Sequence, residues 1–410
     1  MTVQAAVTDQ PWLTSAPTRA VIYALEAAGG PGCVRFVGGC VRNALMDHPV
    51  DDIDLATRLL PDVVMQALKG AGLKVVPTGL AHGTVTAVSK GIPYEITTLR
   101  RDVSTDGRNA TVAFTDDWHE DAARRDFRLN ALYADADGTV FDPTGHGVED
   151  AYAGRIVFVG DPETRIREDY LRILRFFRFL ARYGRGAPDP AGLAACKALA
   201  PGMSRLSAER VSKELLKLLA APDPRLAMQD MADAGVLAQI LPNHRPLATF
   251  DAMVAVSPDA VLRLSVLLPE DGALIAETGR ALRLPNAMID RLVAAAAEPV
   301  DLSMPDPAAR AILYRSGRRA FEDRVLRAEA LANAPGSGRA LLDLAARWPI
   351  PRLPVGGRQV AAAGLAAGPE TGLVLKDFED SWIADDFPTE GHAERLKTLI
   401  EARTISPPPV

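Results

Sequence analysis

The stretch that decides the fold is FVGGCVRN at residues 36–43, followed by DDIDL at residues 51–55. Strand side chains alternate between two faces, so Asp52 and Asp54 are predicted to project from the same face of one strand, where two carboxylates can hold a divalent metal ion. Gly38 and Gly39 let backbone N–H groups approach a polyphosphate without an obstructing Cβ, and the N-terminus of the following helix favours negative charge. The stretch therefore predicts a metal-dependent site for nucleotidyl transfer.

The composition is that of an ordinary soluble globular protein. The chain has 410 residues, of which 48% are hydrophobic and 24% charged, with a formal net charge of −6. This length predicts two to four domains, and the net charge argues against a uniformly basic nucleic-acid coat. Three cysteines cannot form a disulfide framework, and no apolar run is long enough to span a membrane, so a cytoplasmic protein is expected.

The first 143 residues predict a mixed α and β unit. Lys90-Gly91-Ile92-Pro93 joins two β-rich runs in a hairpin, and the polar residues 101–120 have the profile of a mobile active-site loop. The other predicted elements are helices over 18–28, 41–46, 61–69 and 120–131 and a hairpin over 132–143.

Glu95 lies in the second run of the first hairpin. Its side chain is a candidate third acid beside Asp52 and Asp54. The alternative is a strand glutamate that faces solvent, and the sequence does not separate the two interpretations.

After about residue 150 strand patterns nearly disappear, and helical patterns dominate. The predicted helices are 164–183, 191–199, 207–219, 225–237, 258–268, 287–297, 307–314, 320–332, 338–346 and 390–402. On the first of them Asp169, Arg172, Arg175 and Arg178 recur every three residues and form one polar stripe, opposite an apolar side.

This stripe suits the recognition of a nucleotide base. An arginine beside an aspartate presents donors and an acceptor in one plane, which matches the Watson–Crick edges of cytosine and adenine. Uracil and guanine place a donor where the arginine also donates, and are penalised. The alternative is an amphipathic helix with ion pairs between residues three apart.

With these residues in view, the chain resembles the class II polynucleotide nucleotidyltransferases, and is most similar to the bacterial CCA-adding tRNA nucleotidyltransferases. Five motifs carry the resemblance in family order and cover about half the chain. They are GGCVRN with DDID at 38–54, RRDFRLNAL at 124–132, DPTGHGVED at 142–150, REDYLRILRFFRF at 167–179 and SAERVSKELLKLL at 207–219.

The resemblance implies an activity and a role for each matching residue. The implied reaction adds C, C and A to the 3′ end of tRNA from CTP and ATP with release of pyrophosphate, at a two-metal site where Asp52 and Asp54 hold Mg²⁺. The residues implied to bind the nucleotide are Gly38, Gly39, Arg42, Arg125, Asp126 and Asn130, with Asp169 and Arg172 as the base-selecting pair and Arg175 and Arg178 beside them.

The implied fold class is α+β, with a polymerase-β-like nucleotidyltransferase head followed by an all-helical neck, body and tail. The predicted domains are the head at 1–140, the neck at 141–220, the body at 221–305 and a tRNA-binding tail at 306–410. Three residues depart from the family pattern: Asn43 replaces an aspartate, Arg128 a small or hydroxyl residue, and His146 a frequent glycine.

Other functions remain open at this point. Sister enzymes with the same motifs add poly(A), CC only or A only, and motifs in the head separate them weakly. An enzyme that nucleotidylates a small molecule needs no long helical tail, and a non-catalytic RNA-binding module needs neither Asp52 nor Asp54. Arginines 310, 315, 318, 319, 324 and 327 of the tail are candidates for holding the tRNA acceptor arm or are ordinary surface residues.

Overall fold

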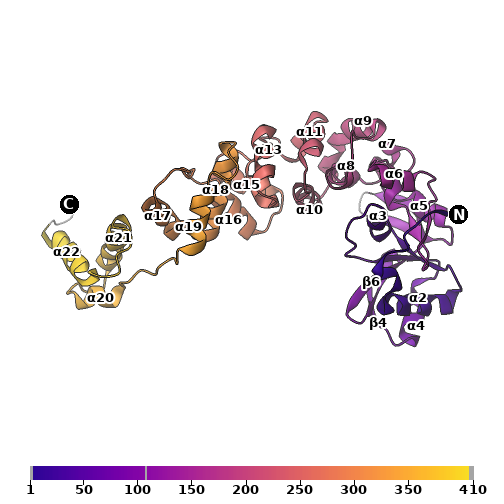
Figure 1. The fold of residues 1–410 in the computed structure, drawn as a ribbon, viewed down its shortest axis with the longest axis horizontal. Coiled ribbons are helices and arrows are strands. Elements are labelled where there is room, and N and C mark those ends of the chain that lie inside the picture. Colours follow the sequence, from indigo (N-terminus) through magenta and orange to yellow (C-terminus); the bar gives the residue numbers. More distant parts are fainter. Residues whose placement is uncertain (1–2, 107–108, 406–410) are drawn as a thin grey trace. The chain divides into compact units, whose positions relative to one another are not determined.

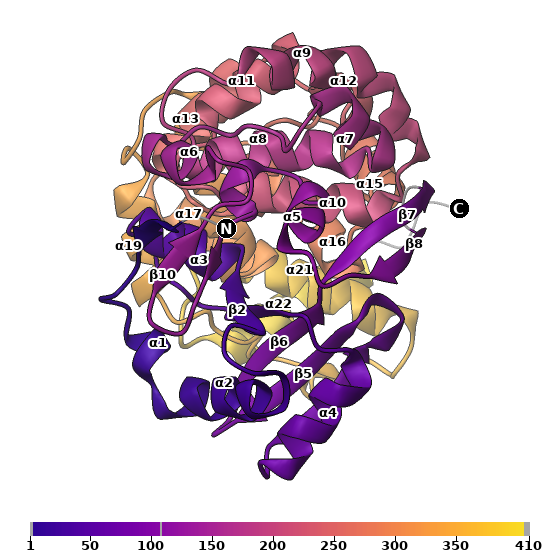
Figure 2. The same ribbon diagram turned by 90° about the vertical axis from the view of Figure 1, so that its right-hand side faces the viewer.

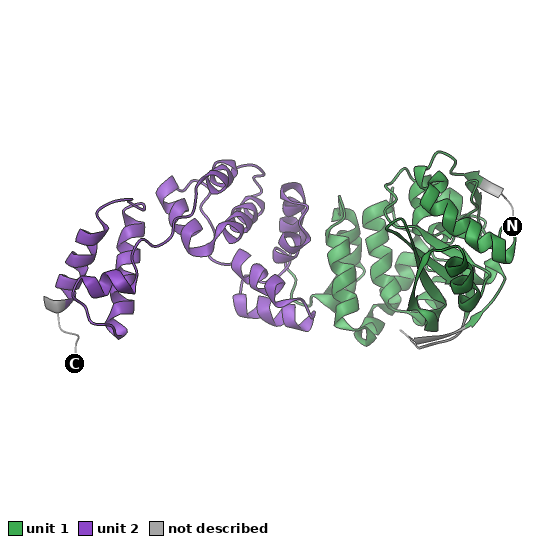
Figure 3. Ribbon diagram, turned by 90° about the horizontal axis from the view of Figure 1, so that it is seen from below, with its two compact units in different colours: residues 1–244 green, residues 245–410 purple. Residues whose placement is uncertain are grey.

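The computed structural model describes residues 3–106 and 109–405 and divides them into two compact units, residues 1–244 and 245–410 (Figures 1 and 3). Unit 1 holds a mixed sheet with helices, and the described part of unit 2 is helical. This arrangement confirms the predicted α+β head followed by helices. The boundaries between the four predicted domains remain a prediction.

Over the described residues, the sheet of unit 1 has eight strands in the order β1-β10-β9-β2-β3-β6-β5-β4. Strands β3 and β6 run parallel, with Asp54 beside Glu95, and the other neighbouring strands are antiparallel. The strands are β1 (Val3–Ala6), β2 (Val34–Val37), β3 (Asp54–Thr57), β4 (Lys74–Gly79), β5 (Thr84–Ser89), β6 (Ile92–Thr98), β9 (Tyr133–Ala134) and β10 (Thr139–Phe141).

Helices α2 (Ala16–Gly29) and α4 (Pro61–Gly70) pack against each other (Figure 2). Helix α4 also contacts β4 and β5, and α2 contacts β2 and β5. Both begin with a proline in the first turn, where its missing N–H has no intrahelical partner to lose. The first helix of the motif region, α3 (Gly39–Leu45), follows β2, and α1 (Pro11–Thr14) precedes α2. The predicted helices that correspond to α2, α3 and α4 are confirmed, as are the two predicted hairpins. Helix α1 and strands β1 and β4 were not predicted from the sequence.

The polar segment 101–120 is not an irregular loop over its described residues. It forms a separate two-stranded ribbon, β7 (Arg100–Asp106) with β8 (Asn109–Phe114), followed by α5 (Trp118–Ala123). Residues 107 and 108 lie outside the described residues. Alternating Val, Thr and Ala residues are as compatible with a strand as with a polar loop, and pairing between the two halves decides for the strand.

The remainder of unit 1 is helical. The predicted helix over 164–183 is interrupted: α7 (Pro162–Glu168) ends before Asp169, whose backbone is extended, and α8 (Leu171–Tyr183) follows. The predicted helix over 225–237 also breaks, at Gly235 with its left-handed backbone. The other helices are α6 (Gly147–Ala153), α9 (Pro190–Leu199), α10 (Ala208–Leu219), α11 (Arg225–Asp233) and α12 (Val236–Ile240).

Four phenylalanine rings hold α8 against the head. Phe127 contacts Phe158 at 4.9 Å and Phe179 at 5.0 Å between ring centroids, and Phe158 stacks on Phe176 at 5.5 Å. All four are buried. Each fully buried phenylalanine contributes about 1.5–3 kcal/mol, so α8 is fixed to the segment after α5 by apolar packing.

Unit 2 has its own apolar clusters, one around Phe321 and Val325 and another around Phe378 and Trp382. No described helix is both long and apolar enough to cross a bilayer. The helices are α13 (Leu247–Val256), α14 (Ala260–Ser265), α15 (Gly272–Ala281), α16 (Asn286–Ala295), α17 (Asp306–Ser316), α18 (Arg318–Leu331), α19 (Arg339–Arg347), α20 (Gly357–Ala362), α21 (Pro369–Ala384) and α22 (His392–Ile405). Helices α13, α15, α20 and α21 were not predicted from the sequence.

Candidate active site

The predicted acidic pair lies at the start of β3. The strand begins at Asp54, so Asp52 belongs to the segment before it and the prediction of one strand carrying both acids is wrong. Burial, followed by the nearby charge of Glu95, raises the pKa of Asp54 to about 6, with a further contribution from Asp52. Arg125 and Arg42 lower it in part. The structure therefore places Glu95 and Asp52 each close enough to Asp54 to repel its charge.

The two glycines shape the turn from β2 into α3. Gly38 has φ of 68° and ψ of −116°, a conformation that glycine adopts without steric cost, and its N–H donates to the carbonyl of Leu132 at 3.1 Å. A Cβ at Gly38 would lie 3.5 Å from Nη1 of Arg125. Gly39 is the first residue of α3. The turn therefore faces the predicted phosphate-binding arginine of another segment.

Arg42 of α3 is 7% exposed and connects the head to α8. Its guanidinium donates to Oδ1 of Asn43 at 2.8 Å, to the hydroxyl of Tyr183 at 2.8 Å and to Oδ1 of Asn130. It also lies over the ring of Tyr183, 4.2 Å from the centroid. Burial lowers the pKa of Arg42, and the nearby Tyr183 and Asp126 offset this only in part.

The segment 120–131 is not one helix. Helix α5 ends at Ala123, the chain then turns, and a short 3₁₀ segment covers Arg128–Asn130. The turn separates Arg124 and Arg125, which stay near the end of α5, from the Asp126 and Asn130 pair. The sequence does not announce the end of α5, because the residues there all tolerate a helix. Tertiary contacts override their local propensity.

Asp126 is the buried acceptor beneath this turn. Its Oδ1 accepts from Asn130 Nδ2 at 2.9 Å, and its Oδ2 accepts from Arg175 Nε at 2.7 Å. Burial alone would raise the pKa of Asp126, but Arg175 and the hydrogen bond from Asn130 lower it to about 2. The predicted residues of the second and fourth motifs therefore meet in one hydrogen-bonded group.

The predicted base-selecting pair lies at the break between α7 and α8. Asp169 accepts from Arg210 Nη2 at 2.7 Å through Oδ2 and from the N–H of Leu171 at 3.1 Å through Oδ1. Arg172 donates to Glu168 Oε2 at 2.6 Å and to the carbonyl of Arg124 at 3.0 Å. The two side chains thus have separate partners and do not pair with each other in this structure.

The predicted stripe is confirmed for its three arginines, since Arg172, Arg175 and Arg178 are half-buried on one side of α8. It is wrong for Asp169, which lies before α8 on extended backbone. Arg178 pairs with Glu214 of α10, with 2.6 Å between Nε and Oε2. Each arginine of the stripe therefore meets a carboxylate from a different segment.

Sequence reasoning missed several residues that hold these side chains in place. Two of them had a local signal: Asp121 stands three and four residues before Arg124 and Arg125, and Glu168 stands four residues before Arg172. The others come from distant segments and carry no local signal. They are Tyr133, Tyr183, Arg210 and Glu214.

The three departures from the family pattern have different surroundings. Asn43 accepts from Arg42 and donates to the carbonyl of Pro49 at 2.6 Å. Arg128 lies 3.7 Å from the buried carboxylate of Asp150, and His146 is an exposed neighbour of Glu149. Asn43 is therefore the departure that touches a predicted nucleotide-binding residue.

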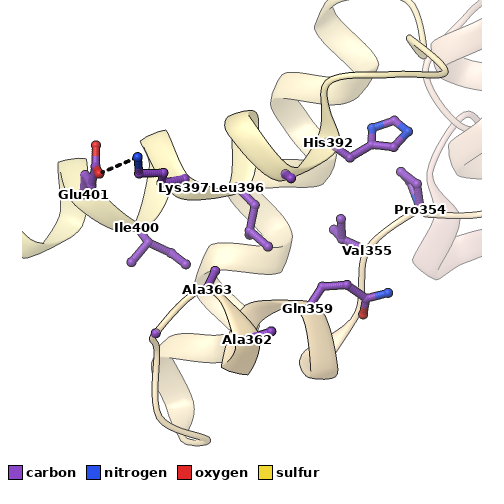
Figure 4. A pocket seen from close by; sticks show the side chains of 12 residues that line it. Pro354, Val355, Gln359, Ala362, Ala363, His392, Leu396, Lys397, Ile400 and Glu401 are labelled. Carbon is purple, nitrogen blue, oxygen red and sulfur yellow. Dashed lines mark ion pairs between the residues drawn. The ribbon is translucent and has the colours of Figure 1, made fainter.

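Unit 2 contains a cavity that, unlike this site, is lined mainly by apolar side chains. It measures about 730 Å³ and lies between α20 and α22 (Figure 4). Val355, Leu396 and Ile400 line it, and Lys397 pairs with Glu401 at its edge, 3.9 Å between Nζ and Oε1. An apolar cavity whose lysine is paired does not suit a polyphosphate.

The tail arginines are mostly engaged within unit 2. Arg327 is buried and pairs with Glu270, so the prediction that it belongs to an RNA-binding surface is wrong. Arg310 and Arg315 pair with Asp386 and Asp380. The hypothesis of a basic tail surface therefore loses its buried member.

Comparison with known proteins places these features in a family. A model described as the poly A polymerase head domain matches residues 34–157, and one described as the probable RNA and SrmB-binding site of polymerase A matches residues 187–247. The mitochondrial CCA tRNA nucleotidyltransferase 1 of Homo sapiens is 34% identical over 376 residues, which cover 87% of this chain and 84% of that protein.

Two further relatives are bacterial. The CCA-adding enzyme of Lactobacillus johnsonii is 32% identical over 358 residues, 84% of this chain and 87% of that protein. The crystal structure of the Bacillus stearothermophilus CCA-adding enzyme in complex with CTP matches with a TM-score of 0.76 and 29% identity, over 97% of this chain and 99% of that one.

Proposed function

The chain belongs to the family of CCA-adding tRNA nucleotidyltransferases, and from this membership we propose how unit 1 carries out the reaction. The protein adds C, C and A to the 3′ end of tRNA from CTP and ATP without a nucleic-acid template. In each step the 3′-oxygen of the RNA forms a bond to the α-phosphorus of the nucleotide. The bond from that phosphorus to the β-phosphate oxygen breaks, pyrophosphate leaves, and the hydroxyl proton is released to solvent.

Mg²⁺ is part of the proposal, with Asp52 and Asp54 as its ligands. The raised pKa of Asp54, caused by burial and by Glu95, is the observation that supports a cation there, because a bound cation would relieve this repulsion. Within the described ranges, no three Cys, His, Asp or Glu side chains form a metal-binding group. This fits Mg²⁺, which is usually bound by one or two carboxylates together with substrate phosphates.

When bound, Mg²⁺ supplies positive charge to the attacking 3′-oxygen and the triphosphate. Glu95 is proposed as the third acid, since it lies in register with Asp54 on the neighbouring strand. Its carboxylate adds negative charge to the site and so favours the cation. The side chain of Glu95 is exposed.

The nucleotide is proposed to lie between the glycine turn and the segment after α5. Gly39, the first residue of α3, offers its backbone N–H to the phosphates, and Arg125 beside the turn offers a guanidinium. The N–H of Gly38 is taken by the carbonyl of Leu132, so Gly38 serves by keeping the turn free of a side chain. Asp126 and Asn130 serve the ribose, with Arg175 holding Asp126 ionised. Arg42 has most of its donors engaged by Asn43, Asn130 and Tyr183, so it supports the phosphate site through these contacts and its charge.

Base selection is assigned to Asp169 and Arg172, with Arg175 and Arg178 beside them. Asp169 and Arg172 are held from the side by Arg210 and Glu168, which leaves their remaining hydrogen-bonding capacity for a base edge. Each pairs with an oppositely charged neighbour, so the net charge of the group changes little when these side chains rearrange on nucleotide binding.

A cytoplasmic location is also proposed, because the three cysteines are buried and unpaired, as expected in a reducing compartment.

One experiment tests this function against its sisters. The purified protein is incubated with tRNA that lacks its 3′ end and with each nucleoside triphosphate singly and together, and the product ends are sequenced. Addition of C, C and A followed by a stop supports the proposal. Long A tails, or a stop after CC or a single A, would assign the chain to a sister activity instead.

Replacing Asp54 by asparagine tests the metal assignment in the same assay. Incorporation of CTP and ATP is expected to be abolished while tRNA binding, measured by filter retention, is unchanged. Retained incorporation would show that these carboxylates do not hold the catalytic metal.

A further inference from the structure

Asp121 of α5 is a buried carboxylate whose two oxygens are both saturated. It is 1% exposed. Oδ1 accepts from Arg124 Nε at 2.9 Å and Nη2 at 2.7 Å, and Oδ2 accepts from Arg125 Nη2 at 2.9 Å and from the hydroxyl of Tyr133 at 2.7 Å. Burial by itself raises the pKa of Asp121, but the two guanidiniums and the tyrosine hydroxyl lower it well below its usual range. The group is therefore ionised at neutral pH.

The end of α5 is also the point where two arginines from α7 and α8 dock. The carbonyl of Ala123 accepts from Arg165 Nη1 at 2.8 Å, and the carbonyl of Arg124 accepts from Arg172 Nη2 at 3.0 Å. Such carbonyls have no partner within their own helix, and cations are favoured beside them. Glu168 pairs with both Arg165 and Arg172. The orientation of the Arg172 side chain therefore depends on the position of the last turn of α5.

The opposite side of the same carboxylate faces the phosphate half of the site. Asp121 holds Arg125, whose Nη1 lies beside the Gly38 turn, and the charge of Arg125 acts on Asp54. Tyr133 completes this arm, since its hydroxyl donates to Asp121 and accepts from Arg125 Nε at 3.3 Å. The carboxylate of Asp121 thus bonds to Arg125, which lies beside the glycine turn, and to Arg124, whose carbonyl accepts from Arg172.

We propose that Asp121 is a positioning residue that links the nucleotide-phosphate end of the active site to its base-selecting end. It acts through Arg125 toward the glycine turn and through Arg124, by its carbonyl, toward Arg172. Adjacent guanidiniums repel each other, and the carboxylate between them fixes both in the bonded arrangement. This inference rests on the proposed function, and it adds that nucleotide affinity and base choice change together when Asp121 is altered.

The alternative is a buried ion pair that only stabilises the fold, and a matched control separates the two. Asp323 in unit 2 is 4% exposed and accepts from Arg291 Nε at 2.7 Å and Nη2 at 2.9 Å, so it resembles Asp121 in burial and in bonding to arginine. The variants are Asp121→Asn, Tyr133→Phe and the control Asp323→Asn, all in the full-length chain. Tyr133→Phe removes one arm of the network without removing the carboxylate.

The assay measures single additions to two RNA primers. On tRNA lacking all three terminal nucleotides, KM and kcat are measured for CTP and the rate is compared with UTP; on tRNA ending in CC, the same is done for ATP and GTP. A melting curve of each variant records stability separately.

Asp121→Asn is expected to raise KM for both CTP and ATP about tenfold, because charge-assisted hydrogen bonds that place the arginines are lost, and to reduce discrimination against UTP and GTP. Tyr133→Phe is expected to act in the same direction, by about threefold. Asp323→Asn is expected to leave KM and discrimination within about twofold, since distant sites act independently.

Two results from the variants would overturn the proposal while the proposed function stands. If Asp121→Asn lowers the melting temperature yet leaves KM and discrimination like those of Asp323→Asn, the residue is structural only. If Asp121→Asn does not fold, Tyr133→Phe decides, and unchanged KM and discrimination in that variant refute the link. A wild-type protein that adds neither C nor A would instead overturn the proposed function and this inference together.

Discussion

Replacing Arg175 by methionine removes the guanidinium that neutralises Asp126 and leaves a buried carboxylate behind. Asp126 then keeps its hydrogen bonds from Asn130 and from the N–H of Phe127 at 2.8 Å, but no charged partner at bonding distance. Methionine preserves much of the apolar length of the arginine side chain. The variant therefore tests the ion pair more than the packing.

The pH dependence of Asp126 sets the expected magnitude. A carboxyl whose pKa is about 2 in the folded protein against 3.8 ordinarily contributes about 2 kcal/mol of stability. Because the folded pKa is the lower one, this contribution is complete above the unfolded pKa and is lost as pH falls from about 4 to 2. Removing one partner of a buried pair costs about 3–5 kcal/mol, so we expect a loss of about 3 kcal/mol at pH 7.

The sign of the pH effect reverses in the variant. Without Arg175, burial dominates and raises the pKa of Asp126, so protonation on mild acidification relieves the uncompensated charge. The stability difference between wild type and Arg175→Met is therefore expected to shrink between pH 7 and pH 5. This reversal distinguishes lost charge compensation from lost packing, which has no such pH dependence.

Urea unfolding of the full-length chain, with hydrogen exchange measured on peptides from α8, gives the free energy and its location. The exchange measurement is needed because two compact units need not unfold together. The control is Arg167→Met, which removes an exposed ion pair with Glu163 and is expected to cost less than about 1 kcal/mol. A loss below about 1 kcal/mol for Arg175→Met, or a difference that grows as pH falls, would refute the reasoning.

Three further predictions follow from the same site. Arg172→Ala is expected to admit UTP and GTP in single-addition assays, because the donor that penalises them is gone; unchanged selectivity would remove its base-reading role. Gly38→Ala is expected to lower stability by about 1–2 kcal/mol in thermal melts through its positive φ, whereas Gly39→Ala, at a helical position, leaves the melting temperature nearly unchanged; equal effects would contradict the backbone explanation. Tyr183→Phe leaves a buried N–H of Arg42 without its acceptor and is expected to cost about 1–3 kcal/mol in urea unfolding, and a variant as stable as wild type would show that the bond is replaced.

Elements with a strong local pattern were predictable from the sequence. The hairpin joined by Lys90 and Gly91 has a turn whose two residues both take positive φ, and the pairing of β5 with β6 follows from it. The arginine stripe of α8 repeats every three residues, and it lies on one side of the helix as predicted. In both cases the pattern extends over neighbouring residues, so local geometry is enough to determine it.

The misassigned boundaries have a common physical cause. Helix α5 ends at Ala123, and Asp169 separates α7 from α8. The residues at both places tolerate a continuous helix. The carbonyls freed at the first break are taken up by arginines of α7 and α8, and the side chain of Asp169 is taken up by Arg210. Partners from distant segments compensate the lost helical hydrogen bonds, and no local signal announces them.

The opening stretch at residues 36–55 shows the same division. The sequence by itself determined the apolar strand, the glycine turn and the acids that follow it, because each depends on neighbouring residues. Tertiary structure alone decided that Glu95 lies beside Asp54, that Arg125 faces Gly38 and that Arg42 bonds to Tyr183. These contacts join residues up to 141 positions apart, and they form only when the sheet and α8 have packed together.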